Sequence, residues 1–238
     1  MLQKNPEAQI SAVASLVEEL HLHEGSGHDW QHIRRVWLTA ENIGRKMGAD
    51  ILVVAAAALL HDADDRKLTG DIATEDALPT ARCIMAKSGM ETAVIERVCD
   101  TVRMIGFHKS LKGIQPDTLE AMVVSDADQL DAIGAVGIAR TFVYGASRQR
   151  AMFDPDRLPM TEFTAAQYDK DEGHTVSHFF EKLLKLRERM FTEAGRIEAD
   201  RRHRRMVDFL EGFFEETSAQ EAWSELLSSY RIDKRDAV

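Results

Sequence analysis

The sequence predicts an all-α protein. Apolar residues recur at helical spacing along nearly the whole chain, and no stretch keeps the alternation of a β-strand. The expected helices are divided by glycine and proline, and no internal repeat is present. With 238 residues, of which 44% are hydrophobic, the chain can bury a sizeable core in one helical domain, or in one domain with a helical appendage.

The first three helices are expected before residue 61. The apolar stripe of the first consists of Val13, Leu16, Val17 and Leu20. The second is expected over about residues 27–47, ended by Gly48 in a left-handed cap, and Asp50 is a suitable N-cap for the third. Residues 51–60 are apolar on nearly all sides, which predicts a helix at the centre of the domain.

The rest of the chain is also predicted to be mainly helical. Pro79 is a candidate for the true start of the next helix. Two loops are expected, at 109–117 and at 146–173, and the second is long enough to be a lid or rim. The expected helices cover residues 74–87, 91–104, 118–133, 135–144, 174–216 and 219–230.

Charge and composition narrow the class of partner. Asp and Glu total 40 against 30 Lys and Arg, so bulk charge does not favour nucleic acid. Residues 201–205 read Arg-Arg-His-Arg-Arg, but glutamates in the same helical region favour a salt-bridged surface. Cys83 and Cys99 lack metal or redox spacing, and no signal peptide or membrane span is recognisable. We expect a cytoplasmic protein that binds neither nucleic acid nor membrane.

The most distinctive local feature is the end of the central helix, Leu59-Leu60-His61-Asp62. Polar groups at the end of a core helix cost several kcal/mol unless they are paired, and a divalent cation would satisfy both side chains. The alternative is an ordinary helix C-terminus with a histidine favoured by the helix dipole and a solvated acidic turn. The dipeptide alone does not decide between them.

Two further motifs change this balance. Gly27-His28-Asp29-Trp30-Gln31-His32 stands upstream and Asp126-Ala127-Asp128-Gln129-Leu130-Asp131 downstream, which gives the order His, His-Asp, Asp on three helices. This pattern resembles the HD superfamily of metal-dependent phosphohydrolases, and the similarity extends over roughly residues 24–205. The resemblance implies an HD-domain helical bundle with additional C-terminal helices. Within a single domain, 1–238, it implies a core at about 24–145, a loop or lid at 146–173, and C-terminal helices at 174–238 packing on the core.

The resemblance also implies one divalent metal ion and its ligands. Imidazole mixed with carboxylate suits Mn²⁺ or Mg²⁺, and Fe²⁺, Co²⁺ or Ni²⁺ can occupy the same kind of site. Four protein ligands leave about two positions of an octahedral ion for water and substrate. The implied ligands are His32, His61, Asp62 and Asp128.

Further roles follow from the same resemblance. Asp65 would orient or deprotonate the attacking water, and Lys67 would neutralise a phosphate oxygen beside the catalytic ligand Asp62. The alternative for Asp65 and Lys67 is an exposed charged turn. The candidate substrate-binding residues are His28, Arg35, Arg140, His178, Lys182 and Lys185, and His108 is a weaker candidate. For individual members the alternatives are a metal ligand (His28), an ion pair inside the bundle (Arg35) and a solvated face (His178, Lys182 and Lys185). Asp126 is expected to be a hydrogen-bond anchor and Asp131 to buttress the site.

The expected activity is hydrolysis of a small phosphorylated substrate, a nucleotide in the relatives that the sequence resembles. A nucleoside triphosphate pyrophosphohydrolase is favoured. The alternatives are a nucleoside monophosphate phosphatase and a non-catalytic nucleotide-binding HD module. A cyclic-dinucleotide phosphodiesterase is disfavoured because the dyad is followed by Ala63-Asp64-Asp65-Arg66-Lys67, and a di-iron oxygenase would need more histidines. A homodimer is left open as the assembly.

Overall fold

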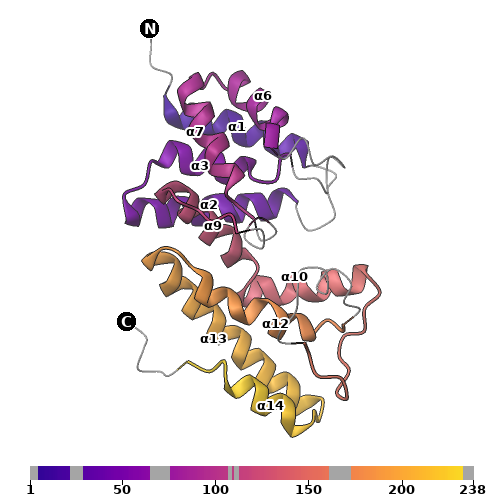
Figure 1. The fold of residues 1–238 in the computed structure, drawn as a ribbon. Helices are drawn as coiled ribbons and strands as arrows, with labels where there is room; N and C mark the ends of the chain where they lie inside the picture. The colour runs from indigo at the N-terminus through magenta and orange to yellow at the C-terminus, as the bar shows by residue number, and fades with distance from the viewer. Residues whose placement is uncertain are drawn as a thin grey trace. The chain divides into compact units, whose positions relative to one another are not determined.

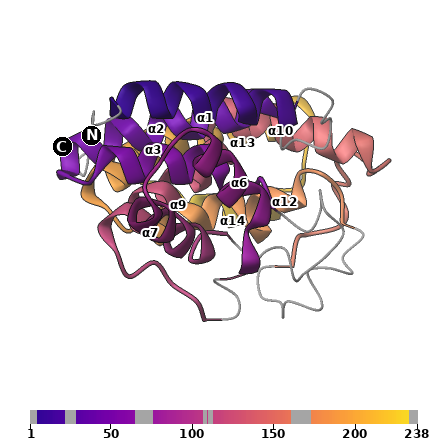
Figure 2. The same cartoon turned by 90° about the horizontal axis from the view of Figure 1, so that it is seen from above.

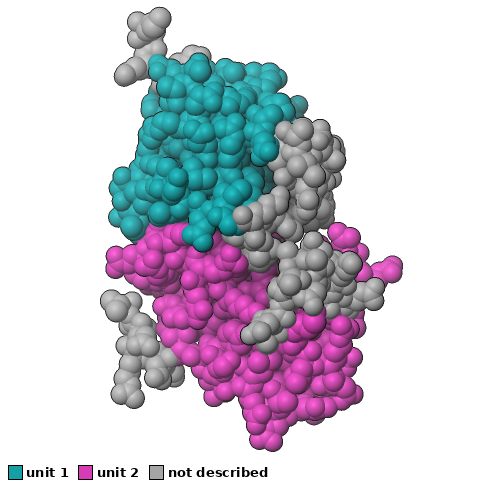
Figure 3. All heavy atoms as spheres, viewed as in Figure 1, with its two compact units in different colours: residues 1–128 teal, residues 129–238 magenta. Residues whose placement is uncertain are grey.

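The structure is a computed structural model that describes residues 5–21, 29–64, 76–106, 109, 113–160 and 173–232. Within these ranges every regular element is helical, which confirms the predicted all-α fold (Figure 1). The chain forms two compact units, Met1–Asp128 and Gln129–Val238 (Figure 3). The helices are α1 (Pro6–Leu20), α2 (Trp30–Met47), α3 (Ile51–Leu60), α6 (Pro79–Lys87), α7 (Thr92–Arg103), α9 (Leu119–Asp131), α10 (Gly134–Ser147), α12 (Ser177–Glu181), the 3₁₀ helix η1 (Leu183–Arg189), α13 (Glu193–Glu216) and α14 (Glu221–Ser228).

Helix α3 forms the centre of the first unit, as its composition predicts. Its residues from Val53 to Leu60 are all buried. It packs against α1, α2 and α7, and it lies among them in both views of the ribbon (Figure 1, Figure 2). Asp50 caps its first turn by accepting from the Leu52 N–H at 3.1 Å, and Gly48 ends α2 with a φ of 75°. Both predicted helix ends are therefore confirmed.

Three details of the first unit differ from the sequence expectations. Helix α2 begins at Trp30, because the Asp29 carboxylate accepts from the His32 N–H at 2.8 Å and so caps it. Helix α6 begins at Pro79 and not at residue 74, which confirms Pro79 as the candidate for its true start. Leu20 lies outside the buried stripe of α1, with 46% of its surface exposed.

The second unit is built around α13, which packs against α10, η1 and α14. The segment 174–216, expected to be helical, does not form one continuous helix. The segment divides into α12, η1 and α13, with an extended residue at Met190. The Thr192 hydroxyl caps α13 by accepting from the Gly195 N–H at 2.9 Å, a start signal that overrides the continuous apolar periodicity.

The structure also bears on the basic run at residues 201–205, on the two cysteines and on the expected absence of a membrane span. Arg201 and Arg202 both pair with Glu198, which supports the salt-bridged interpretation of the basic run. Cys83 is exposed and Cys99 is buried, and neither forms a disulfide. Among the residues that the structure describes, no helix combines the length and apolar character needed to span a membrane.

Candidate metal centre

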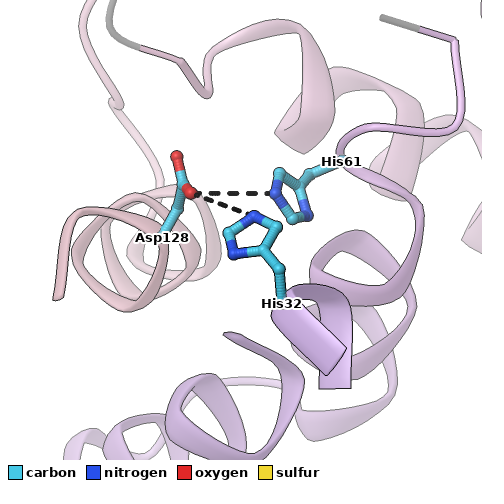
Figure 4. Close-up of side chains that lie close together, drawn as sticks. All are labelled: His32, His61 and Asp128. Atoms are coloured by element: carbon cyan, nitrogen blue, oxygen red, sulfur yellow. Dashed lines mark ion pairs between the residues drawn. The ribbon is translucent and has the colours of Figure 1, made fainter. Parts of the chain in front are cut away.

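Three of the predicted ligands lie close to the ends of helices. His32 lies in the first turn of α2, His61 directly follows α3, and Asp128 lies in the last turn of α9. Figure 4 shows the two imidazole rings and the Asp128 carboxylate turned toward one another from these separate elements. Their ligand atoms all lie within 4.8 Å of each other. The sequence places these residues up to 96 positions apart, and the fold brings their ligand atoms together from α2, the end of α3 and α9.

The Nε2 atoms of both histidines face both carboxylates. His32 Nε2 lies 3.5 Å from Asp62 Oδ2 and 3.7 Å from Asp128 Oδ1. His61 Nε2 lies 3.4 Å and 3.8 Å from the same two oxygens. The imidazoles of both histidines are 3% exposed, and the carboxylate of Asp62 is 9% exposed against 29% for Asp128. The cluster is therefore almost closed at Asp62 and more accessible at Asp128.

The hydrogen bonding of His61 fixes the role of its second nitrogen. Its Nδ1 atom lies 2.8 Å from the carbonyl oxygen of Ala58, which can only accept, so Nδ1 carries a proton. Its Nε2 atom is buried and has no hydrogen-bond partner among the residues that the structure describes. A buried nitrogen without a partner is costly, and a neutral imidazole here presents its Nε2 lone pair to two carboxylates. A cation at the centre of the cluster would satisfy all of these groups at once.

The separations fit a shared metal ion. Ligand atoms on one ion with bonds of about 2.1 Å lie roughly 3.0 to 4.2 Å apart in octahedral or tetrahedral geometry. The four separations between imidazole nitrogen and carboxylate oxygen given above, 3.4 to 3.8 Å, fall inside that interval. The donor set of two nitrogens and two carboxylates also suits a first-row divalent ion. The residues present therefore fit the predicted metal.

Several predicted site residues of the first unit lie outside the described residues. These are the proposed base Asp65, the proposed phosphate partner Lys67, and His28 with the weaker candidate His108. Arg35 is described, and its side chain is half-buried on α2 near His32 in sequence. Asp126 is completely buried on α9, in keeping with an anchoring role. The functions of all these residues stay predictions.

The other predicted substrate residues belong to the second unit. Arg140 forms an ion pair with the buried Asp131 at 2.5 Å, so Asp131 supports α10 within this unit. Lys182 and Lys185 are half-buried and three residues apart at the start of η1, where such residues lie on one face. Burial, together with the neighbouring Lys182 and Arg150 charges, lowers the pKa of His178 to about 3. His178 is therefore neutral at pH 7, a hydrogen-bonding group rather than a cation.

One residue with a structural role at this site was not singled out from the sequence. Asp64 is 2% exposed, and its carboxylate oxygens accept from the backbone N–H groups of Thr80 and Ala81 at 3.0 and 2.9 Å. The sequence carries a signal for the missing local cap but none for the residue that replaces it. Leu78-Pro79 starts a helix without a capping side chain of its own, and Asp64 supplies the cap from 16 positions away.

Comparison with known proteins identifies the family. Residues 29–133 match the model of the HD domain. The uncharacterized protein YpgQ of Bacillus subtilis strain 168 is 34% identical over 203 residues, which cover 85% of this chain and 90% of YpgQ. The chain therefore belongs to the HD superfamily. A solved structure of a Bacillus thuringiensis HD-superfamily hydrolase is 32% identical to it with a TM-score of 0.71, and the match covers 91% of this chain and all of that one.

Two other solved structures resemble the chain over most of its length. A Lactobacillus plantarum protein is 32% identical with a TM-score of 0.76, covering 90% of this chain and 98% of its own. The structure of Bacillus subtilis YpgQ in complex with ADP is 29% identical with a TM-score of 0.70, covering 89% of this chain and 96% of its own. The sequence resemblance to HD hydrolases is thus confirmed at the level of the family.

Proposed function

We propose that this protein is a metal-dependent phosphohydrolase that acts on a nucleotide, with a nucleoside triphosphate as the favoured substrate and a monophosphate and pyrophosphate as products. The observation that carries the proposal is the convergence of the His32 imidazole and the Asp62 and Asp128 carboxylates around the buried His61 Nε2 atom, which has no hydrogen-bond partner among the described residues. The ADP bound by the relative YpgQ supports a nucleotide as the ligand class.

In this proposal His32, His61, Asp62 and Asp128 hold one divalent ion, with Mn²⁺ or Mg²⁺ expected. When bound, the ion lowers the pKa of a coordinated water and polarises a phosphoryl oxygen. The Ala58 carbonyl keeps the His61 ring in the tautomer that leaves Nε2 free to bind a metal. The greater exposure of Asp128 makes its side of the cluster the expected approach for substrate.

The remaining roles follow the sequence prediction. Asp65 is proposed to orient or deprotonate the attacking water, and Lys67 to offset charge on the phosphoryl oxygens. His28 and Arg35 are proposed to contact substrate from the first unit. In the second unit, the proposed phosphate-binding cations are Arg140, Lys182 and Lys185. Because its pKa is about 3, His178 is proposed to act as a neutral hydrogen-bond donor.

The test combines metal reloading with product identification. Metal-depleted protein is reloaded separately with Mn²⁺, Mg²⁺, Co²⁺ or Ni²⁺ and incubated with nucleoside tri-, di- and monophosphates. Pyrophosphate released from a triphosphate supports the proposal. Orthophosphate from monophosphates alone identifies a phosphatase instead, and full metal occupancy without turnover identifies a binding module. The Asp62→Ala variant should lose all activity, while Asp100→Ala, which removes an exposed carboxylate of α7, should keep it.

A further inference from the structure

A contact outside the ligand cluster ties the His61–Asp62 turn to another helix. Asp64 follows Asp62 by two residues, and each of its carboxylate oxygens accepts one backbone N–H, from Thr80 at 3.0 Å and from Ala81 at 2.9 Å. The carboxylate is buried, with the residue 2% exposed. Thr80 and Ala81 follow Asp64 by 16 and 17 residues, so the contact joins the turn that carries His61 and Asp62 to the start of α6.

Helix α6 depends on this contact for its start. Leu78 occupies the N-cap position with a φ of 51° and offers no side-chain acceptor, and Pro79 has no N–H. Thr80 and Ala81 carry the first N–H groups of the helix, and both are satisfied by Asp64. The negative carboxylate also interacts favourably with the positive end of the helix dipole. A buried acidic residue from elsewhere in the chain thus replaces the missing local cap.

The helix that Asp64 caps is fixed to the scaffold of the first unit. Helix α6 packs against α1 and α7, and α3, which ends at His61, packs against the same two helices. The turn that carries His61 and Asp62 is therefore held at one end by α3 and at the other by the Asp64 contact with α6. The turn itself is short, with the Ala63 N–H donating to the Leu60 carbonyl at 3.1 Å.

We propose that Asp64 is a positioning residue that holds the His61–Asp62 turn against the N-terminus of α6 and so keeps Nε2 of His61 and Oδ2 of Asp62 in metal-binding geometry. This inference rests on the proposed metal site. It also gives the adjacent acids different tasks: both Asp64 oxygens accept backbone N–H groups of α6, whereas Asp65 is the proposed base. Partners that orient metal ligands from outside the ligand set commonly contribute 10- to 100-fold to metal affinity.

Three variants test the proposal. Asp64→Ala removes both acceptors, and Asp64→Asn keeps one, because an amide has a single oxygen. Thr192→Ala is the matched control, since it removes a buried cap of α13, a helix of the second unit without a metal ligand. For each protein we would measure the melting temperature, the affinity for Mn²⁺ by calorimetry, and amide hydrogen exchange of residues 60–64 and 80–81.

The proposal predicts distinct results for the three variants. Asp64→Ala should weaken Mn²⁺ binding by about 10- to 100-fold, Asp64→Asn should fall between it and the wild type, and Thr192→Ala should bind Mn²⁺ as the wild type does. Exchange in Asp64→Ala should rise both at Thr80 and Ala81 and across the His61–Asp64 turn. The proposal would be overturned if Asp64→Ala bound Mn²⁺ with wild-type affinity and showed only a lower melting temperature, as Thr192→Ala should. Asp64 would then act only as a helix cap.

Failure of the metal site itself would be recognised separately. If the wild type binds no Mn²⁺, the proposed function fails, and hydrogen exchange still decides the role of Asp64. Faster exchange of the His61–Asp64 turn in Asp64→Ala would uphold its positioning role. An effect confined to Thr80 and Ala81 would overturn it.

Discussion

The Nδ1 atom of His61 lies 2.8 Å from the carbonyl oxygen of Ala58, one helical turn earlier in α3. The last turn of the central helix therefore sets the tautomer of the histidine that follows it, because a carbonyl can only accept. The Nε2 atom is left buried and facing the carboxylates of Asp62 and Asp128 at 3.4 and 3.8 Å, and no other described residue forms a hydrogen bond with it. A divalent cation bound among these groups would be attracted by both carboxylates and by the imidazole lone pair.

This relationship predicts that metal stabilises the fold. Mn²⁺ at about 100 times its dissociation constant should add roughly 2.7 kcal/mol to the free energy of unfolding. For a chain of this length the melting temperature should rise by about 5 to 10 °C. Differential scanning calorimetry of metal-depleted protein with and without Mn²⁺ measures the shift.

The Asp62→Asn variant should lose most of that shift, because an amide is a much weaker metal ligand than a carboxylate. Asp100→Asn is the control, since Asp100 is an exposed acid paired with Arg103 on α7. Its metal-induced shift should equal that of the wild type. An equal shift in Asp62→Asn would place the metal elsewhere.

The sequence was sufficient to predict the central helix and the candidate ligands. Residues 51–60 are apolar on every side, which allows only a buried helix, and the order His, His-Asp, Asp has a family precedent. The sequence was not sufficient for Asp64, because its cap reaches α6 from 16 positions away and no local pattern records that contact. The break at Thr192 was missed for a related reason, since one hydroxyl outweighed a long apolar periodicity.

The two cysteines should differ sharply in reactivity. Cys83 is exposed on α6, whereas Cys99 is buried on α7, and burial raises the pKa of the Cys99 thiol. Because the thiolate is the reactive form, a disulfide reagent at pH 8 should label one thiol per native chain rapidly and the second only after unfolding. Cys83→Ser should abolish the fast phase and Cys99→Ser should leave it unchanged. Two equally fast thiols in the native protein would contradict the burial of Cys99.

The stability of the second unit should depend on pH through His178. Its pKa is about 3 in the folded protein, against 6.5 for an unperturbed histidine, because of burial and the nearby Lys182 and Arg150 charges. Below pH 6.5 the imidazole of His178 becomes protonated in the unfolded chain, whereas in the folded chain it stays neutral until the pH approaches about 3. The stabilisation is therefore complete above pH 6.5 and decreases as the pH falls toward 3, by at most about 1.4 kcal/mol per pH unit.

Urea unfolding of the wild type and of His178→Gln at pH 7 and pH 5 measures this effect. The wild type should lose more stability between the two pH values than the variant, whose side chain does not titrate. An imidazole signal of His178 that titrates near pH 6.5 in the NMR spectrum of the native protein would contradict the prediction.

Two glycines within helices should respond oppositely to the same substitution. A Cβ atom at Gly145 of α10 would lie 2.1 Å from Oγ1 of Thr175, whose hydroxyl is held by the Ala151 carbonyl at 3.1 Å. At Gly212 of α13 a Cβ atom would meet nothing within 4 Å. Gly145→Ala should therefore destabilise the protein by about 1 to 3 kcal/mol through overpacking. Gly212→Ala should stabilise it by roughly 0.5 to 1 kcal/mol, because alanine loses less backbone entropy in a helix.

Urea unfolding followed by circular dichroism compares the two variants under the same conditions. Both glycines lie in the second unit and both substitutions add one methyl group, so the pair isolates the space around the new side chain. The double variant Gly145→Ala with Thr175→Ser removes the Thr175 methyl, which lies 3.0 Å from the added Cβ, but keeps the hydroxyl at 2.1 Å. It should therefore recover only part of the lost stability, since the hydroxyl makes the closer contact. A Gly145→Ala protein as stable as Gly212→Ala would show that the approach of α10 to Thr175 is looser than these distances require.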